Sequence, residues 1–385
     1  ITKYQDDGKN RTAKKIYQLL REPLKIPKLL QKRTKYDIMK AEQGKGGSSM
    51  KQISLFAEEN RLQKLSALGD CLERLKIIDW ESFRPIIALA LIRERKSNAG
   101  RRPFDSVMLF KTIVLQRLYN LSDDQTEFQI NDRMSFMRFL GLSLDDKVPD
   151  AKTIWLFKDT LTKAGIMEQL FSQFNRMLEE RGIITHKGTI VDATFVDVPR
   201  QRNSREENRK IKNGETPEEW NENPHKIAQK DTDARWTKKG DETHYGYKDH
   251  VKVDADSKLI LDYEVTPANV HDSNEFEEFF GEEDQAAYAD SAYVGKELPE
   301  HIRNEVCEKG YRNKPLTEEQ KENNRRKSKI RCRIEHVFGF MTVSMHGLTL
   351  RSIGLSRARF NIGLTNLVYN LCRFAIVSRK AKCTG

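Results

Sequence analysis

The sequence contains little cysteine and no long apolar run. Five cysteines are scattered over 385 residues, and no two of them form a Cys-x-x-Cys pair. This pattern argues against a disulfide framework and favours a reducing, intracellular setting. No apolar stretch approaches the length of a membrane span, and no secretory signal is visible at the beginning of the chain. We therefore expect a protein that does not associate with a membrane.

Acidic residues are absent from the last fifty positions, and charge is unevenly distributed along the chain. The net charge is +11, of which residues 1–49 contribute +8 and residues 336–385 contribute +7. Residues 50–335 therefore carry a charge of −4. Basic ends around an acidic centre indicate a polyanionic partner, with carboxylates left between them to bind a cation. Solubility alone would also explain the charge.

Residues 1–49 differ in composition from the rest of the chain. They are rich in Lys and Arg, and they end in Gly-Lys-Gly-Gly-Ser-Ser before Met50. Such an ending is typical of a flexible linker, so we predict a basic extension or linker here. Met50 could be a natural start, with the preceding segment an upstream extension. Alternatively, the segment is a basic arm that lies along phosphates.

Residues 50–184 show the three- and four-residue apolar spacing of helices, beginning with the leucines from Leu62 to Leu75. Asp105, Ser122 and Asp150 stand where helices are expected to begin, and Gly141 where one is expected to end. We predict an all-helical domain that serves DNA binding or dimerisation. Simple packing of helices would produce the same apolar faces.

The stretch Gly188–Pro199 has the composition of a β-strand. It reads G-T-I-V-D-A-T-F-V-D-V-P, and its apolar residues fall on both faces, which indicates a central strand covered on two sides. Asp192 interrupts this run. Because a buried carboxylate is costly unless it is paired or bound to a metal, Asp192 suggests a divalent cation. Asp197 in the same stretch competes for this role.

Residues 185–380 mix strand and helix signals and predict an α/β domain, with a mixed sheet flanked by helices. Its expected elements, in order, are the strand above, a hairpin of 247–253 and 259–265, a helix through 272–280, a short strand ending at Asp290, and helices at about 295–309, 318–346 and 356–377. A polar insertion at about 200–244 has little to bury. It reads equally as a solvated loop or as a DNA contact whose Trp220 and Trp236 stack on bases.

Three carboxylates stand out by their context. Asp192 lies inside a strand, Asp290 ends a later strand, and Glu335 lies beside the apolar face of a helix. If the two strands are neighbours, their carboxylates meet at one edge of the sheet, and a helix packed on that sheet can bring Glu335 to them. Three converging carboxylates could bind two Mg²⁺ ions and serve phosphodiester chemistry.

Two of these carboxylates also have an ordinary explanation. Asp290 could be a turn residue at a strand end, and Glu335 could form a helical ion pair with Arg331, worth about 0.2–0.5 kcal/mol. Cys332 and His336 have the spacing of zinc ligands. No second pair accompanies them in the sequence, so we discount zinc.

A cluster of basic residues precedes Glu335 without an acid among them. Its members are Arg325, Arg326, Lys327, Lys329, Arg331 and Arg333. Such a cluster would neutralise a DNA backbone beside the site of cleavage. We assign Arg325, Arg326, Lys329, Arg331 and Arg333 to DNA contacts, together with Lys248 and Trp236.

The motifs of this chain, taken in order, resemble those of the IS5 insertion-sequence transposases, which belong to the wider DDE group. The resemblance covers about Met50 to Arg373. Its motifs include Gly100-Arg-Arg-Pro, Val191-Asp-Ala-Thr, Tyr245-Gly-Tyr-Lys-Asp-His, Thr266-Pro-Ala-Asn-Val-His-Asp-Ser, Ala289-Asp-Ser-Ala-Tyr and Arg333-Ile-Glu-His-Val-Phe-Gly. Ser328 and Thr342 depart from the family's C-terminal signature, which places a Tyr and a basic residue there.

The resemblance implies a ribonuclease-H-like catalytic core in which Asp192, Asp290 and Glu335 bind two Mg²⁺ ions, with Mn²⁺ as a substitute. It implies a transposase that binds terminal inverted repeats in double-stranded DNA, cleaves the element ends and joins the 3′-hydroxyl to target DNA. A homodimer in the bacterial or archaeal cytoplasm, associated with the nucleoid, is expected. The alternatives are a transposase-derived DNA-binding protein without catalysis and a nuclease without strand transfer.

Overall fold

The structure is a computed structural model that describes residues 56–92 and 102–384. The chain divides into two units, Ile1–Glu58 and Glu59–Gly385. The second unit holds nearly all of the described residues, and the description below concerns it. The expected basic extension or linker at 1–49 lies outside the described residues.

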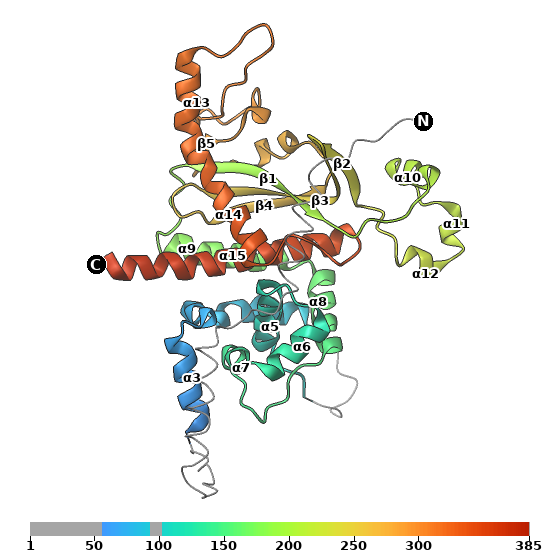
Figure 1. Cartoon of the computed structure of the whole chain (residues 1–385), viewed down its shortest axis with the longest axis vertical. Helices are drawn as coiled ribbons and strands as arrows, with labels where there is room; N and C mark the ends of the chain where they lie inside the picture. Colours follow the sequence, from blue (N-terminus) through green and yellow to red (C-terminus); the bar gives the residue numbers. More distant parts are fainter. Residues whose placement is uncertain (1–55, 93–101, 385) are drawn as a thin grey trace, which may run out of the picture. The chain divides into compact units, whose positions relative to one another are not determined.

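The first part of this unit is helical, as predicted (Figure 1). Three predicted helix starts are confirmed, because the carboxylates of Asp105 and Asp150 and the hydroxyl of Ser122 accept hydrogen bonds from backbone amides of the first turn. Gly141 ends its helix at a φ of 78°, which a side chain would disfavour. The elements are α3 (Ala57–Ala67), 3₁₀ turns at Cys71–Ile77 and Trp80–Phe83, α4 (Arg84–Ala90), α5 (Ser106–Leu118), α6 (Asp123–Asp132), α7 (Met134–Leu140), α8 (Ala151–Ala164) and α9 (Met167–Glu180).

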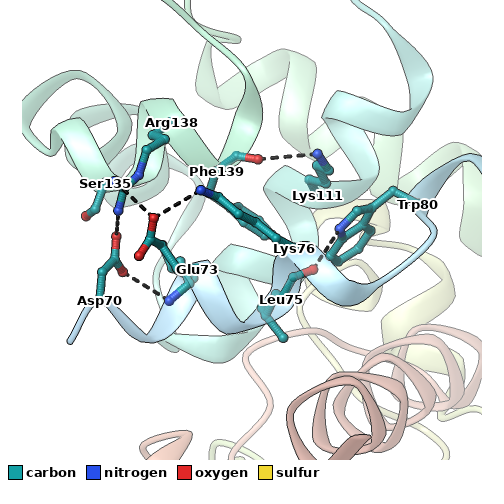
Figure 2. A pocket seen from close by; sticks show the side chains of 10 residues that line it. Asp70, Glu73, Leu75, Lys76, Trp80, Lys111, Ser135, Arg138 and Phe139 are labelled. Atoms are coloured by element: carbon teal, nitrogen blue, oxygen red, sulfur yellow. Dashed lines mark hydrogen bonds and ion pairs between the residues drawn. The ribbon is translucent and has the colours of Figure 1, made fainter. Parts of the chain in front are cut away.

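The leucines from Leu62 to Leu75 do not share one helix. α3 ends at Ala67, Gly69 adopts a φ of 91°, and a 3₁₀ turn follows. Arg138 of α7 bridges this break, since it lies 2.6 Å from Asp70 and 3.3 Å from Glu73 (Figure 2). It also donates to the carbonyl of Leu62. A glycine turn fixed by an arginine therefore replaces the helix that the spacing predicted.

The second part contains a six-stranded mixed sheet with helices against it, so the predicted α/β class is confirmed. β3 pairs antiparallel with β1 and β4, β1 pairs parallel with β5, and β5 pairs parallel with β6. The order is thus β4-β3-β1-β5-β6, with β2 paired to the first residues of β3. The strands are β1 (Thr189–Asp197), β2 (Arg235–Lys239), β3 (Glu242–Asp254), β4 (Ile260–Pro267), β5 (Ala286–Tyr288) and β6 (Arg303–Asn304).

Helices cover the face of the sheet that carries Ile190 and Asp192. α15 (Leu355–Thr384) and α9 pack there, as the rings of Phe171 and Tyr263, 4.9 Å apart, illustrate for α9 (Figure 1). Asn366 of α15 donates to Asp249 of β3 at 3.0 Å within the core, and neither residue is exposed to solvent. None of the described helices combines the length and apolarity that a bilayer crossing requires.

The opposite face of the sheet is covered by short turns rather than by the helix predicted at 272–280. This segment forms two 3₁₀ turns, Asp272–Asn274 and Glu277–Phe279, and its phenylalanines pack with Val191. The helix predicted at 295–309 is also wrong, because this segment contains β6. The amides of Glu305 and Cys307 donate to the carbonyls of Ala287 and Ala289 in place of a helical ladder.

The polar insertion is partly folded, contrary to the expectation that it has little to bury. It forms α10 (Arg205–Lys212), α11 (Glu218–Asn221), α12 (Pro224–Ile227) and β2. Trp220 is fully buried, and its indole donates to Glu207 at 2.6 Å. Trp220 is therefore a core residue and does not present its ring for stacking on a base.

The predicted helix at 318–346 is confirmed as one helical segment, but its type changes along its length. α13 (Glu318–Arg331) passes through a 3₁₀ turn at Cys332–Ile334 into α14 (Glu335–Gly339) and a π-helical turn at Phe340–Ser344. Ile334, Val337 and Met341 are buried in the main core. The acid of interest, Glu335, is the first residue of α14.

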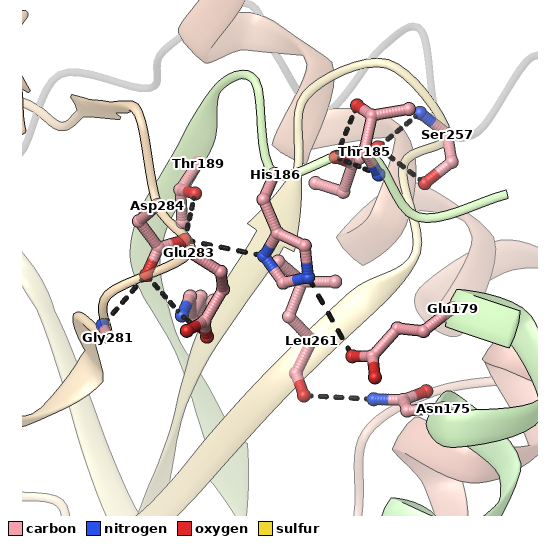
Figure 3. A network of polar contacts seen from close by, with 12 residues as sticks. Asn175, Glu179, Thr185, His186, Thr189, Ser257, Leu261, Gly281, Glu283 and Asp284 are labelled. Carbon is pink, nitrogen blue, oxygen red and sulfur yellow. Dashed lines mark hydrogen bonds and ion pairs between the residues drawn. The ribbon is translucent and has the colours of Figure 1, made fainter. Parts of the chain in front are cut away.

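A buried ionic cluster attaches the segment before β5 to the centre of the sheet (Figure 3). Asp284 is inaccessible to solvent and accepts hydrogen bonds from Thr189 of β1 and Lys252 of β3, each at 2.7 Å. His186 lies 3.6 Å away. Burial raises the pKa of Asp284, but the hydrogen bond from Lys252 and weaker contributions outweigh it, so the pKa is lowered overall. This cluster fixes the start of the strand that leads to Asp290.

Candidate active site

Asp192 lies in the middle of β1, on the strand that joins the antiparallel and parallel halves of the sheet. Its side chain is 21% exposed, and one carboxylate oxygen accepts a hydrogen bond from the amide of Ala193 at 2.8 Å. Burial raises the pKa of Asp192 to about 6, and the nearby charge of Asp290 adds to this rise. The carboxylate is thus partly desolvated, and the positive charges around it are too weak to offset its burial and the charge of Asp290.

Asp290 follows the neighbouring parallel strand at the matching position. β1 and β5 pair Thr189 with Ala287 and Ile190 with Tyr288. Continuing this register by two residues sets Asp290 opposite Asp192, in agreement with their electrostatic repulsion. The carboxylate of Asp290 also accepts a hydrogen bond from the amide of Ala292 at 2.7 Å, and Asp290 thereby caps the 3₁₀ turn Ser291–Tyr293. The sheet therefore brings together the two aspartates predicted from the sequence.

Glu335 does not form a close group with the two aspartates. Arg331, the last residue of α13, reaches from this helical segment to the sheet, with its Nη1 3.6 Å from Oδ2 of Asp192. Glu335 stands four residues later, and its side chain is exposed. Over residues 56–92 and 102–384, no three His, Cys, Asp or Glu side chains are grouped closely enough to hold a metal ion.

The two aspartates nevertheless have the donor chemistry that a hard divalent cation prefers. Both offer carboxylate oxygens, and their mutual repulsion would be relieved by a cation placed between them. The guanidinium of Arg331 lowers the pKa of Asp192, but burial and Asp290 outweigh it. The residues present at Asp192 and Asp290 therefore fit Mg²⁺ or Mn²⁺.

Asp197 does not share this position. It lies five residues after Asp192 on the same strand, so its side chain emerges on the other face of the sheet. There its carboxylate is 3.5 Å from His244. Cys332 and His336 are exposed on the helical segment, where the thiol of Cys332 donates to the carbonyl of Lys329.

The basic residues assigned to DNA differ in how far they are already paired. Arg325 lies 3.0 Å from Glu322, and Arg326 lies 3.3 Å from Glu305. Lys329 is exposed and has no ion pair among the described residues. Arg333 points to the turn between β3 and β4, where it donates to the carbonyl of Ala255 at 2.7 Å. Arg331 is the member of the cluster that reaches Asp192.

Lys248 and Trp236 lie in different environments. Lys248 is buried, and its ammonium donates to the carbonyl of Val270 and to Asp272 at 2.6 and 2.7 Å. In this arrangement it offers no free cation to DNA. Trp236 of β2 is 41% exposed, and it packs against Tyr245 while the guanidinium of Arg200 lies over its ring. Trp236 thus remains accessible.

Lys239 of β2 was not singled out by sequence reasoning, although its charge lowers the pKa of Asp192. Its ammonium lies 5.7 Å from the ring centre of Phe195, which stacks on His244 at 4.1 Å. β2 and the first residues of β3 form a hairpin around Gly240. Gly240 between the two strands was the sequence signal for this hairpin. The polar composition of the insertion favoured a loop instead, so the hairpin was not predicted.

Comparison with known proteins finds a family match for each of the two parts of the chain. Residues 184–371 match a family model described as a transposase DDE domain, and residues 59–160 match a transposase domain (DUF772). Asp192, Asp290 and Glu335 all lie within the first match. A solved structure, the piggyBac transposase synaptic complex with hairpin DNA, is 11% identical, with a TM-score of 0.41. That alignment covers 82% of this chain and 75% of the other.

Proposed function

We propose that this chain, whose helical part and sheet-containing part match two transposase family models, acts as an insertion-sequence transposase of the IS5 type. Asp192, Asp290 and Glu335 are its catalytic and metal-binding residues in this proposal. It binds the inverted repeats at both element ends in double-stranded DNA, cleaves there and joins the freed ends to target DNA.

One observation carries the assignment of the site. Asp290, two residues beyond the end of β5, lies opposite Asp192 of the adjacent parallel strand, where its charge raises the pKa of Asp192. Folding stability alone does not favour two like charges so placed, whereas cation binding does. The basic residue beside them, Arg331, supports a phosphate as the substrate group.

The reaction consists of two phosphoryl transfers. In the first, a water molecule loses a proton as its oxygen bonds to phosphorus at the element end, and the 3′ oxygen leaves and takes up a proton. In the second, the resulting 3′-hydroxyl loses its proton as its oxygen bonds to phosphorus in the target strand, whose own 3′ oxygen leaves and takes up a proton. Two Mg²⁺ ions held by Asp192, Asp290 and Glu335 would supply Lewis-acid stabilisation of the entering and leaving oxygens.

The residues of the chain have separate tasks in this scheme. The sheet holds Asp192 and Asp290 at fixed positions, because β1 is paired on both sides. Arg331 donates hydrogen bonds to the non-bridging oxygens of the phosphate beside Asp192. Glu335 contributes its carboxylate from α14, one helical turn beyond Arg331. Two DNA ends and two target strands favour a homodimer.

A nicking assay tests the proposal. Supercoiled plasmid carrying the element ends is incubated with the protein and either Mg²⁺ or EDTA. We expect nicking with Mg²⁺ only, and we expect Asp192→Asn to abolish it while DNA binding persists. Asp197→Asn is the matched control, because the same substitution then falls on the other face of the same strand. Equal nicking by wild type and Asp192→Asn would reject the assignment.

A second candidate, a DNA-binding protein without catalysis, is favoured by the placement of Glu335 apart from the two aspartates. Absence of nicking, with duplex binding retained, would support it. Pre-cleaved ends with a free 3′-hydroxyl separate a transposase from a nuclease, because only a transposase joins them to a second DNA.

A further inference from the structure

A cleft with a cavity volume of about 440 Å³ lies outside the candidate active site. α5, α6 and α8 form one side of it, and residues 349–353 with the first turns of α15 form the other. None of its lining residues belongs to the group around Asp192. Its charged lining residues are Arg117, Lys158, Arg351, Arg357 and Asp123. Four cations against one carboxylate make the cleft strongly basic.

Arg117 of α5 is the unusual member of this set. It is 8% exposed, and its guanidinium donates to the carbonyl of Gly347 at 2.7 Å and to the side chain of Asn120 at 3.4 Å. Its Nε has no hydrogen-bond partner, and no carboxylate is paired with it among the described residues. Burial lowers the pKa of Arg117 to about 10. A buried guanidinium without a counter-ion is costly, so an anion is the missing partner.

The remaining cations differ in their availability. Lys158 is paired with Asp123 at 2.5 Å, and Arg357 lies 3.4 Å from Asp159. Arg351 is exposed and has no ion pair in the part of the chain that the structure describes. Arg117 and Arg351 are therefore the two cations of the cleft whose charge is not balanced.

An aromatic side chain lines the same cleft as these cations. Trp155 of α8 is 51% exposed, although an aromatic of this size is normally well buried. An indole that shares a cleft with two unbalanced guanidinium groups can pack on a sugar or a base while the cations bind the adjoining phosphate. A free phosphate ion would leave the indole without a partner, which favours a nucleic-acid phosphate.

We propose that this cleft binds a backbone phosphate of the transposase's DNA through Arg117 and Arg351, with Trp155 against the neighbouring nucleotide. It is a DNA contact separate from the catalytic carboxylates, built jointly by the helical part and the segment before α15. The inference rests on the proposed function only in that the chain binds DNA, and it does not require that cleavage occurs.

The test uses the full chain in an Asp192→Asn background, so that catalysis cannot affect the result. Binding of a fluorescent duplex is measured by anisotropy over a range of salt concentrations. We expect Arg351→Glu to weaken binding about tenfold and to reduce the slope of log affinity against log salt by about 1. Arg176→Glu, the same change at an exposed position on α9, serves as the control and should leave the slope unchanged.

Two further variants separate a binding role from a structural one. Trp155→Ala should weaken duplex binding without changing the salt slope, because it removes stacking but no charge. Arg117→Met removes the buried cation and should reduce the slope as Arg351→Glu does. Should Arg117→Met fail to fold, the exposed Arg351 and Trp155 variants still decide the matter. Thermal unfolding of each variant monitors folding.

The outcomes are distinct. Unchanged affinity and slope in Arg351→Glu and Trp155→Ala would overturn the proposal. Thermal unfolding is also measured with inorganic phosphate added. If phosphate stabilises the wild type but not Arg351→Glu, while duplex binding is unchanged, the cleft binds a free phosphate and the proposal is overturned. If the wild type does not nick DNA but the variants show the expected salt slopes, the cleft still binds DNA as proposed, and only the proposed catalytic function fails.

Discussion

Nη1 of Arg331 lies 3.6 Å from Oδ2 of Asp192, and this contact joins the helical segment that carries Glu335 to the central strand of the sheet. Arg331 is the last residue of α13, and Glu335 follows one turn later. The contact partly offsets the burial of Asp192 and the charge of Asp290. It makes Arg331 the basic residue of its cluster that is closest to the proposed chemistry.

Replacement of Arg331 should therefore affect cleavage more than replacement of other basic residues. We expect Arg331→Ala to reduce the rate of DNA cleavage by about 10²-fold, because a donor to the phosphate is lost beside the reacting atoms. Arg331→Lys should retain part of the rate, since it keeps the charge but not the paired donors. Arg325→Ala is the control, because Arg325 is exposed and paired with Glu322. Equal rates for Arg331→Ala and Arg325→Ala would contradict the role of Arg331.

Glu335→Gln should abolish Mg²⁺-dependent cleavage while leaving duplex binding within about twofold of the wild type, because the change removes a ligand charge but little volume. The comparison variant is Glu322→Gln, an exposed acid on α13 of the same helical segment. Cleavage on a labelled end duplex and anisotropy on the same duplex measure the two effects. Normal cleavage by Glu335→Gln would remove Glu335 from the site.

Asp249 should make the free energy of unfolding depend on pH. Burial raises its pKa to about 8, and its Oδ2 and Oδ1 of Asn366 are buried without partners. A proton on Asp249 would allow both oxygens to share a hydrogen bond. The folded state keeps this proton up to about pH 8, whereas the unfolded state releases it near pH 4. This group's contribution to stability is therefore full below about pH 4 and is lost as the pH rises to about 8.

Asp249→Asn removes this dependence, because the amide is neutral at every pH and can still pair with Asn366. We expect the variant to match the wild type near pH 4 and to be more stable at pH 8, by about 5 kcal/mol at most, since a tenfold change in proton affinity is worth about 1.4 kcal/mol. Chemical denaturation at several pH values measures the difference. A difference that does not grow with pH would mean that Asp249 is ionised in the folded protein.

Gly363 of α15 marks a close approach to the sheet. A Cβ at this position would overlap Oη of Tyr263 and would lie 2.7 Å from Cγ of Met167. We expect Gly363→Ala to destabilise the protein by about 1–3 kcal/mol through overpacking. Gly339→Ala on α14 is the control, because nothing lies within 4 Å of its Cβ, and it should stabilise the helix by up to about 1 kcal/mol. Adding Tyr263→Phe to Gly363→Ala should recover part of the loss, and its failure to do so would point to another contact.

Local signals predicted much of this fold. The run around Asp192 became β1, the two apolar runs became the β3–β4 hairpin, and the capping residues began the helices as expected. These elements depend on residues close in sequence, such as the Asp105 carboxylate and the amide three residues later. The helix predicted at 295–309 failed for the same reason, because this segment takes its conformation from hydrogen bonds to β5 and the residue after it rather than from its own spacing.

The sequence singled out three acids as candidates for the site, but it did not indicate how they are arranged. The acids could be recognised from their surroundings, whereas the sequence could not show that Asp290 opposes Asp192 while Glu335 remains exposed. Charge by itself also misleads, because Lys248 and Arg331 look alike in the sequence. One is buried against Asp272 and the other reaches Asp192, and only the tertiary arrangement distinguishes them.

The two aspartates and Glu335 of the proposed site differ in how firmly they are held, because the helix type changes between Arg331 and Ser344. Asp192 is held in a strand with partners on both sides, and Asp290 follows directly from the strand beside it, so neither can shift without disturbing the sheet. Glu335 instead sits at a joint where 3₁₀, α and π turns succeed one another, and a small change in winding there swings its side chain around the axis. Adjustment to an incoming DNA end would fall on that joint, leaving the aspartates as the fixed reference against which the scissile bond is aligned.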